Sequence, residues 1–140
     1  MVCSDDTLAP DCLAEQIPWM TDSTLSLVAS RFDLINHEGG TVQRDLGLAD
    51  LVGRIPSSDA MGVFVHRMPD ECFPSAAAMF RREQYDRTTG FRDDFGYTLD
   101  IDLWLQLVAH GDFLGIEQPL AANRASTFNV SSTTSTVAKV

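Results

Sequence analysis

Segments with the periodicity of β-strands alternate along this chain with segments that have the periodicity of helices, and this order limits its fold more than any other feature. The longest strand pattern covers residues 25–35, where Leu25, Leu27 and Ala29 share one face. The strongest helix pattern covers residues 100–110, where apolar side chains recur at four-residue steps. Because strands that alternate with helices are typical of α/β domains, we expect an α/β fold.

The rest of the chain divides into shorter segments. We expect a strand end followed by an acidic turn within residues 1–9, the return strand of a hairpin at residues 41–42, and strands at residues 76–81, 113–116 and 120–124. We expect helices at residues 11–20, 46–55, 57–68 and 83–88. The alanines of residues 76–81 leave a helix open as the alternative there.

Length and composition are those of one globular domain. The chain has 140 residues, of which 44% are apolar and 21% are charged. The predicted strands and helices all lie in residues 1–125, which we take as the domain. Residues 126–140 are rich in Ser and Thr and nearly lack large apolar side chains, so we expect a flexible tail there.

The charge balance argues against one class of partner. The chain has 20 acidic and 10 basic residues, which gives a formal net charge of −10. Because such a surface repels phosphate backbones, we do not expect a nucleic acid as partner. Cys3, Cys12 and Cys72 lack the spacing of a zinc site or a disulfide framework. The apolar runs are shorter than a membrane span and we expect no signal peptide, so the expected location is the cytoplasm.

Two groups of acidic residues are candidates for chemistry. Asp5 and Asp6 follow a predicted strand, and adjacent carboxylates of this kind bind hard divalent cations. The alternative is that they cap the turn before the next helix. Asp100 and Asp102 lie at a predicted helix start, where an acid either caps the helix or, in the case of Asp100, serves as a general base.

A pair of arginines forms a third candidate. Arg81 and Arg82 come at the end of a predicted strand, before a short helix. A solvated basic pair is one interpretation, and an arginine that contacts phosphate or an acceptor is the other.

These groups follow one another in an order that resembles the family 2 glycosyltransferases of the GT-A fold. Those proteins run from an acidic DxD-type motif, through a strand that ends in D-L-I and an MFRRE segment, to an ED-x-DLWL helix and a PL-x-x-x-R strand. The matching positions here are Ser4 to Pro10 with Leu13, Asp33 to Ile35, Met79 to Glu83 with Tyr85, Gly90 and Phe91, Asp100 to Leu105, and Pro119 and Leu120 with Arg124.

The resemblance implies a specific chemistry. It implies a nucleotide-sugar donor, an acceptor that is a sugar, a lipid or a protein, and Mg²⁺ or Mn²⁺ bound by Asp5 and Asp6. It places Asp5, Arg81 and Arg124 at the donor and its metal. It makes Asp100 the base that deprotonates the acceptor hydroxyl, which then displaces the nucleoside diphosphate with inversion.

The sequence departs from the family pattern at several positions. Cys3 stands where the first acid of the DxD-type motif often lies, Leu99 replaces the Glu before the base, and Ser126 lies near the position of a common His. The N-terminal half of the family fold, with its nucleotide-base pocket, has no counterpart in these residues. The resemblance thus implies a partial GT-A three-layer sandwich without its N-terminal strands.

Three hypotheses follow from this incomplete match. The first is a glycosyltransferase fragment whose N-terminal segment is encoded upstream, with possible association with the inner face of a membrane. The second is a truncated, inactive module with a structural or interaction role. The third is a small metal-dependent hydrolase built on the four aspartates Asp5, Asp6, Asp100 and Asp102.

Overall fold

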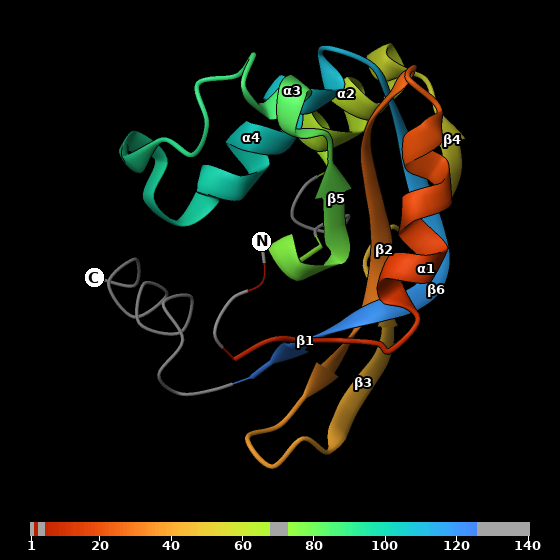
Figure 1. Cartoon of the computed structure of the whole chain (residues 1–140). Coiled ribbons are helices and arrows are strands. Elements are labelled where there is room, and N and C mark those ends of the chain that lie inside the picture. Colours follow the sequence, from red (N-terminus) through yellow and green to blue (C-terminus); the bar gives the residue numbers. More distant parts are fainter. Residues whose placement is uncertain (1, 3–4, 68–72, 126–140) are drawn as a thin grey trace.

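The computed structural model describes residues 2, 5–67 and 73–125 of the chain. In these residues the fold is mixed α/β, with a curled sheet of parallel and antiparallel strands (Figure 1). The strands are β1 (Thr7–Leu8), β2 (Leu25–Ile35), β3 (Thr41–Leu46), β4 (Gly53–Ile55), β5 (Ala78–Phe80) and β6 (Asp112–Arg124). The helices are α1 (Cys12–Gln16), α2 (Ser57–His66), α3 (Arg82–Tyr85) and α4 (Leu99–Val108), with short 3-10 helices η1 (Ile17–Thr21), η2 (Ser75–Ala77) and η3 (Asp93–Thr98).

The centre of the sheet is the parallel pair of β2 and β6 (Figure 1). The pairing begins with Leu25 opposite Asp112 and ends with Ile35 opposite Arg124. Strand β6 has 13 residues and β2 has 11, and the pairing shifts near Arg31, which lies opposite Pro119. The strands predicted at 113–116 and 120–124 are therefore one irregular strand, and the prediction of two was wrong because a local shift in register interrupts the pattern.

The four short strands pair with the outer sides of β2 and β6, two near each end of this central pair. Near the start of the pair, β5 joins β2 and β4 joins β6. Near its end, β3 joins β2 and β1 joins β6. All four additions are antiparallel. This arrangement puts the acidic segment before β1 beside the C-terminal end of β6.

The core covers both faces of β2, which explains why residues 25–30 are all buried. On one face, Leu27 belongs to a cluster that includes Phe64 of α2 and Trp104 of α4. On the other face, Val28 belongs to a smaller cluster against which Met20 of η1 packs. Leu25 belongs to this second cluster and not to that of Leu27 as expected, because the strand register shifts between Leu25 and Leu27. A strand covered on both faces holds its neighbours in fixed positions, and β2 positions β5 and β6 in this way.

The helix predicted at residues 46–55 was wrong. These residues complete β3, form a turn and then form β4. Asp45, Gly47, Leu48 and Gly53 have φ angles of 56°, 80°, 54° and 85°, which a right-handed helix does not allow. Leu48 is nevertheless fully buried, so the leucine spacing reflects a buried turn rather than a helix face.

Three of the longer predicted elements are confirmed. The strand at 25–35 is β2, and the helices at 57–68 and 100–110 are α2 and α4 with slightly different ends. The hairpin predicted at 41–42 is also confirmed, and its return strand β3 extends to Leu46.

Three shorter elements differ from their predicted lengths. The helix at 11–20 divides into α1 and the 3-10 helix η1, whose first turn contains Pro18. The strand at 76–81 shortens to β5, and the helix at 83–88 shortens to α3. Predictions for Met1, Cys3, Ser4, residues 68–72 and the tail 126–140 lie outside the described residues.

Candidate functional site

Asp5 and Asp6 lie directly before β1, where the C-terminal end of β6 passes them. The backbone N–H of Arg124 donates a hydrogen bond to Oδ1 of Asp6 at 3.2 Å. The Arg124 side chain donates from Nε to the backbone carbonyl of Asp5 at 3.0 Å. The fold therefore brings Arg124 to Asp6 and Asp5, from which it lies 118 and 119 positions away in the chain.

The guanidinium of Arg124 also reaches the turn between β2 and β3. Its Nη1 donates to the carbonyls of Asn36 at 2.7 Å and His37 at 3.1 Å. The turn is held by Asn36 Oδ1, which accepts from the backbone N–H groups of Glu38 and Gly40. These contacts fasten the acidic segment to the hairpin; whether Arg124 also contacts a donor stays a prediction.

Asp6 is a partly buried carboxylate beside a second carboxylate, Asp5. Burial raises the pKa of Asp6; the Arg124 backbone N–H opposes this shift, and the neighbouring Asp5 carboxylate adds to it. A bound cation would relieve both the burial of charge and the repulsion between the two carboxylates. The described residues contain no cluster of three or more His, Cys, Asp or Glu side chains that is placed to hold a metal ion. A cation at Asp5 and Asp6 would thus need water or substrate oxygens as further ligands.

Asp100 lies in the first turn of α4 and is partly buried. Its Oδ1 accepts a hydrogen bond from the Ile101 backbone N–H at 2.9 Å. Burial raises the pKa of Asp100, and backbone hydrogen bonds oppose that shift. The buried apolar face of α4, which includes Leu103 and Trp104, fixes the helix and hence the position of this carboxylate.

Asp102 has a structural role that sequence reasoning missed. Its Oδ2 accepts a hydrogen bond from Gln106 at 2.8 Å and lies 3.6 Å from Nε of Arg92. The Gln106 Oε1 accepts from both the backbone N–H and the hydroxyl of Thr89. Asp102 and Gln106 thereby tie α4 to the segment that precedes η3.

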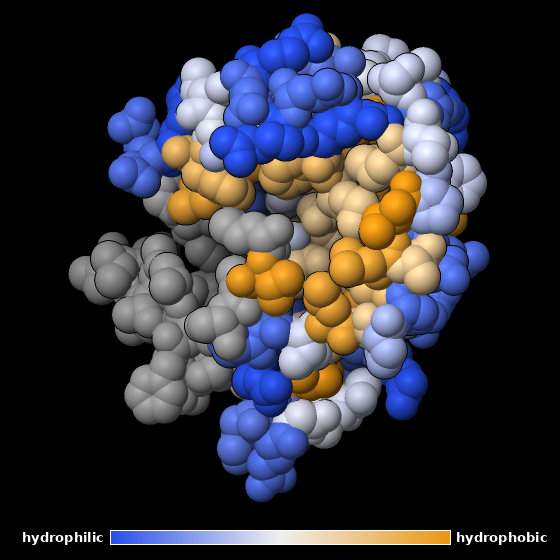
Figure 2. All heavy atoms as spheres, viewed as in Figure 1, coloured by the Kyte–Doolittle hydropathy of each residue, from blue (hydrophilic) through white to orange (hydrophobic). Residues whose placement is uncertain are grey.

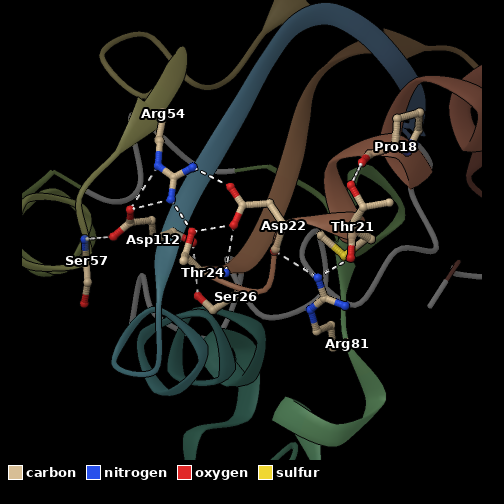
Figure 3. A network of polar contacts seen from close by, with 10 residues as sticks. Pro18, Thr21, Asp22, Thr24, Ser26, Arg54, Ser57, Arg81 and Asp112 are labelled. Atoms are coloured by element: carbon tan, nitrogen blue, oxygen red, sulfur yellow. Dashed lines mark hydrogen bonds and ion pairs between the residues drawn. The ribbon is translucent and has the colours of Figure 1, made fainter.

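Arg81 lies at the end of β5, and its side chain points to the end of η1 (Figure 3). Its Nη2 donates to the backbone carbonyls of Met20 and, at 2.9 Å, Asp22. The contacts described for Arg81 do not include Asp5, Asp6 or Asp100. A donor-binding role for Arg81 stays a prediction.

A polar network joins the starts of β2 and β6 to β4, and no sequence pattern predicted it (Figure 3). Arg54 donates from Nη1 to Asp22 Oδ2 at 2.7 Å and from Nε to Asp112 Oδ2 at 3.0 Å, and it also contacts the Thr24 hydroxyl. Asp112 Oδ1 accepts from the backbone N–H of Ser57. These residues form no local motif, and Arg54 lies in the segment predicted to be helical.

The predicted site residues therefore fall into separate groups. Asp5, Asp6 and Arg124 are in direct contact, whereas Arg81 is bound at η1 and Asp100 lies in α4. The contacts described for Asp100 share no residue with those described for the acidic pair. The structure brings Asp5, Asp6 and Arg124 together. That Asp100 shares a site with Asp5 and Asp6 stays a prediction.

Comparisons with known proteins add no family. Within the described part of the chain, no helix has the length and apolar character needed to cross a membrane. No protein-family model matches the chain, and no curated protein matches it either.

Proposed function

We propose that this chain is part of a metal-dependent glycosyltransferase of the GT-A fold, which transfers a sugar from a nucleotide-sugar donor to an acceptor hydroxyl with inversion. The observation that carries the proposal is the setting of Asp100, a partly buried carboxylate with a raised pKa at the start of a well-anchored helix. A raised pKa makes the carboxylate a stronger base. The ordered series of family-like motifs supports the same conclusion.

Asp5 and Asp6 are the proposed ligands of Mg²⁺ or Mn²⁺. When bound, such a cation neutralises the diphosphate of the donor and stabilises the departing nucleoside diphosphate. The chain's own contribution is to hold the two carboxylates beside the end of β6 through the hydrogen bond from Arg124. Arg81 and Arg124 are the proposed further contacts to the donor.

Asp100 is the proposed acceptor base. Its carboxylate takes the proton of the acceptor hydroxyl, and the acceptor oxygen forms a bond to the anomeric carbon of the donor sugar. The bond from that carbon to the diphosphate oxygen breaks, and its electron pair leaves with the nucleoside diphosphate. One displacement inverts the anomeric configuration, and no protein nucleophile takes part.

The donor also needs a pocket for its nucleotide base. We propose that a segment encoded upstream of Met1 supplies this pocket, and that the complete protein works in the cytoplasm, with peripheral association with the inner face of a membrane where the acceptor is a lipid.

The test is the Asp100→Asn variant in a chain that includes the upstream segment. Donor binding should persist, since the proposed role of Asp100 is towards the acceptor, whereas sugar transfer should fall by at least about 100-fold. Calorimetry of nucleoside diphosphate binding with Mn²⁺ and an assay of transferred sugar measure the two effects. Asp59→Asn, at an exposed position of α2, is the matched control. Unchanged transfer by Asp100→Asn would remove Asp100 from the mechanism.

One observation favours the alternative, a truncated module without activity. The guanidinium groups of Arg81 and Arg124 both bind backbone carbonyls, which is what purely structural arginines do. This alternative expects no Mn²⁺-dependent binding of nucleoside diphosphates with or without the upstream segment. Binding that Asp5→Asn abolishes would rule it out.

A further inference from the structure

Exposed apolar side chains gather on the face that carries β1, α1 and η1. Eight large apolar side chains are exposed among the described residues, and five of them lie in residues 2–19, namely Val2, Leu8, Leu13, Ile17 and Trp19. The other three are spread over the molecule, with Val42 on β3, Val52 before β4 and Val65 on α2. Figure 2 shows apolar side chains concentrated over α1 and β5 on this face. A concentration of this kind indicates a surface that another molecule covers.

This face has a ridge beside a groove. The groove lies between β1, α1 and β5, and the side chains that line it include Leu8, Met79 and Phe80. The ridge consists of Leu13 and Ile17, each 54% exposed. Ile17 has helical dihedral angles and follows Leu13 by four positions, the spacing at which helical side chains lie on one side. Because Leu13 also lines the groove, the ridge forms one of its walls.

The charged residues of this segment lie away from the ridge. Glu15 is two positions from Leu13, and residues at this spacing do not face the same way on a helix. Asp11 accepts a hydrogen bond on Oδ2 from Gln118 of β6 at 2.9 Å. The ridge therefore has the apolar, uncharged character of the central part of a protein interface.

We propose that two copies of this chain associate through this face about a two-fold axis, with the ridge of each copy seated in the groove of the other. A two-fold interface uses the same patch twice, so it needs a patch that is complementary to itself. A ridge beside a groove meets this need, because an axis that passes between them sets each ridge opposite the other copy's groove. This inference concerns the 140-residue chain and uses none of the chemistry of the proposed function.

The size of the apolar face also fits a second copy. A large side chain that is about half exposed presents on the order of 100 Å² of apolar surface. The five exposed side chains of residues 2–19 therefore present roughly 500 Å². A standard interface takes about 800 Å² from each partner, and about 65% of a homodimer interface is apolar, which also gives roughly 500 Å². The face is thus as large as a stable dimer requires.

Analytical ultracentrifugation of the 140-residue chain tests the proposal. The sedimentation coefficient should rise from that of a monomer to that of a dimer between about 1 and 300 µM protein. Ile17→Asp should raise the dissociation constant at least about 30-fold, because it puts a charge into the buried centre of the interface. Val65→Asp is the matched control, since Val65 is 57% exposed on α2, and this variant should dimerise as the wild-type chain does.

Salt distinguishes this dimer from an association through ion pairs. Each copy has a formal net charge of −10, so two copies repel each other. The dissociation constant should therefore fall when the salt concentration rises from about 0.05 to about 0.5 M, because salt screens this repulsion. A dissociation constant that rises with salt would show that opposite charges hold the copies together, and it would contradict the proposal.

A mixture of two variants tests the seating of the ridge in the groove. Ile17→Asp alters the ridge and Leu8→Lys alters the groove, so each variant alone damages both contacts of its dimer. In a heterodimer of the two variants, one contact is native and the other pairs the introduced carboxylate with the introduced ammonium group. The mixture should therefore associate at least about tenfold more tightly than either variant alone.

Other results would overturn the proposal. A wild-type chain that stays monomeric up to about 300 µM at both salt concentrations has no such interface. A dimer that persists in Ile17→Asp forms through another surface, and a dimer that is lost on deletion of residues 126–140 forms through those residues. A mixture that associates no more tightly than its components shows that the ridge does not enter the groove.

Discussion

At the scale of single residues, three arginines connect parts of the chain that are far apart in sequence. Arg54 joins carboxylates at the starts of β2 and β6, Arg81 binds carbonyls at the end of η1, and Arg124 binds carbonyls before β1 and after β2. The planar guanidinium carries five N–H donors, so one side chain can serve several acceptors at once. Their partners are mostly backbone carbonyls, which carry no side-chain signal in the sequence, and this is why the arginines' contacts were not predictable.

The Arg54 network should stabilise the protein in a salt-dependent manner. Arg54→Met keeps much of the aliphatic stem and removes the contacts to Asp22, Thr24 and Asp112. We expect a lower thermal midpoint in dilute buffer and a smaller loss at about 1 M salt, because exposed ion pairs are screened. Differential scanning calorimetry at both salt concentrations measures this. Arg44→Met, at an exposed position of β3, serves as the control, and an equal loss in both variants would contradict the network's role.

Asp100 should carry a stability cost at neutral pH. Because burial raises its pKa in the folded state, the charged form is less favourable there than in the unfolded chain. Asp100→Asn should therefore raise the thermal midpoint at pH 7, and the gain should vanish when the pH falls below the folded-state pKa, where the native carboxyl is neutral. Thermal unfolding of both proteins from pH 7 to about pH 3 measures the effect. A gain that is constant with pH would contradict the assigned cause.

At the scale of elements, the sequence predicted those with uninterrupted periodicity and failed where the backbone turns. Strand β2 and helices α2 and α4 have regular patterns because each packs one or two continuous faces against the core. The segment before β4 has leucines at helical spacing, yet four left-handed residues in and beside it prevent a helix. Periodicity reports which residues are buried and does not distinguish a helix face from a buried turn of similar spacing.

Gly115 marks the point where that turn contacts β6. A Cβ on Gly115 would lie 1.7 Å from the backbone oxygen of Leu51, and backbone on both sides prevents an easy adjustment. We expect Gly115→Ala to destabilise the fold by about 3 kcal/mol or more. Gly62→Ala is the matched control, because a Cβ there meets no atom within 4 Å and Gly62 lies inside α2. It should stabilise the fold by about 0.5–1 kcal/mol. Urea unfolding of both variants tests the pair, and a similar effect of the two substitutions would contradict the close approach.

At the scale of the whole molecule, the parallel pair of β2 and β6 has one polar group at each end. The Arg54 network holds the start of the pair, and Arg124 with Asp6 holds its end, where the proposed cation site lies. The sequence identified Asp5, Asp6 and Asp100 as candidate acids because acidic residues at strand and helix ends form local patterns. No local pattern indicated which basic side chains lie beside these acids. The family resemblance alone placed Asp5 and Arg124 at one site, and their contact over 119 positions depends on the order of the strands in the sheet.

The pH dependence of stability should combine these groups with the net charge of −10. Mild acidification from pH 7 removes negative charge and hence self-repulsion, and it favours the native state through Asp6 and Asp100, whose folded-state pKa values are raised. The hydrogen bonds from Thr24 and Arg54 instead lower the pKa of Asp22. Its stabilising contribution is fully present above its unfolded-state pKa of about 4 and is lost as the pH falls further towards the lowered value. Thermal midpoints should therefore rise from pH 7, pass through a maximum above about pH 4, and fall at lower pH. Asp22→Asn should lower the midpoint at pH 7 and flatten the acidic side of this curve, whereas a steady fall from pH 7 in the wild-type protein would contradict the assigned shifts.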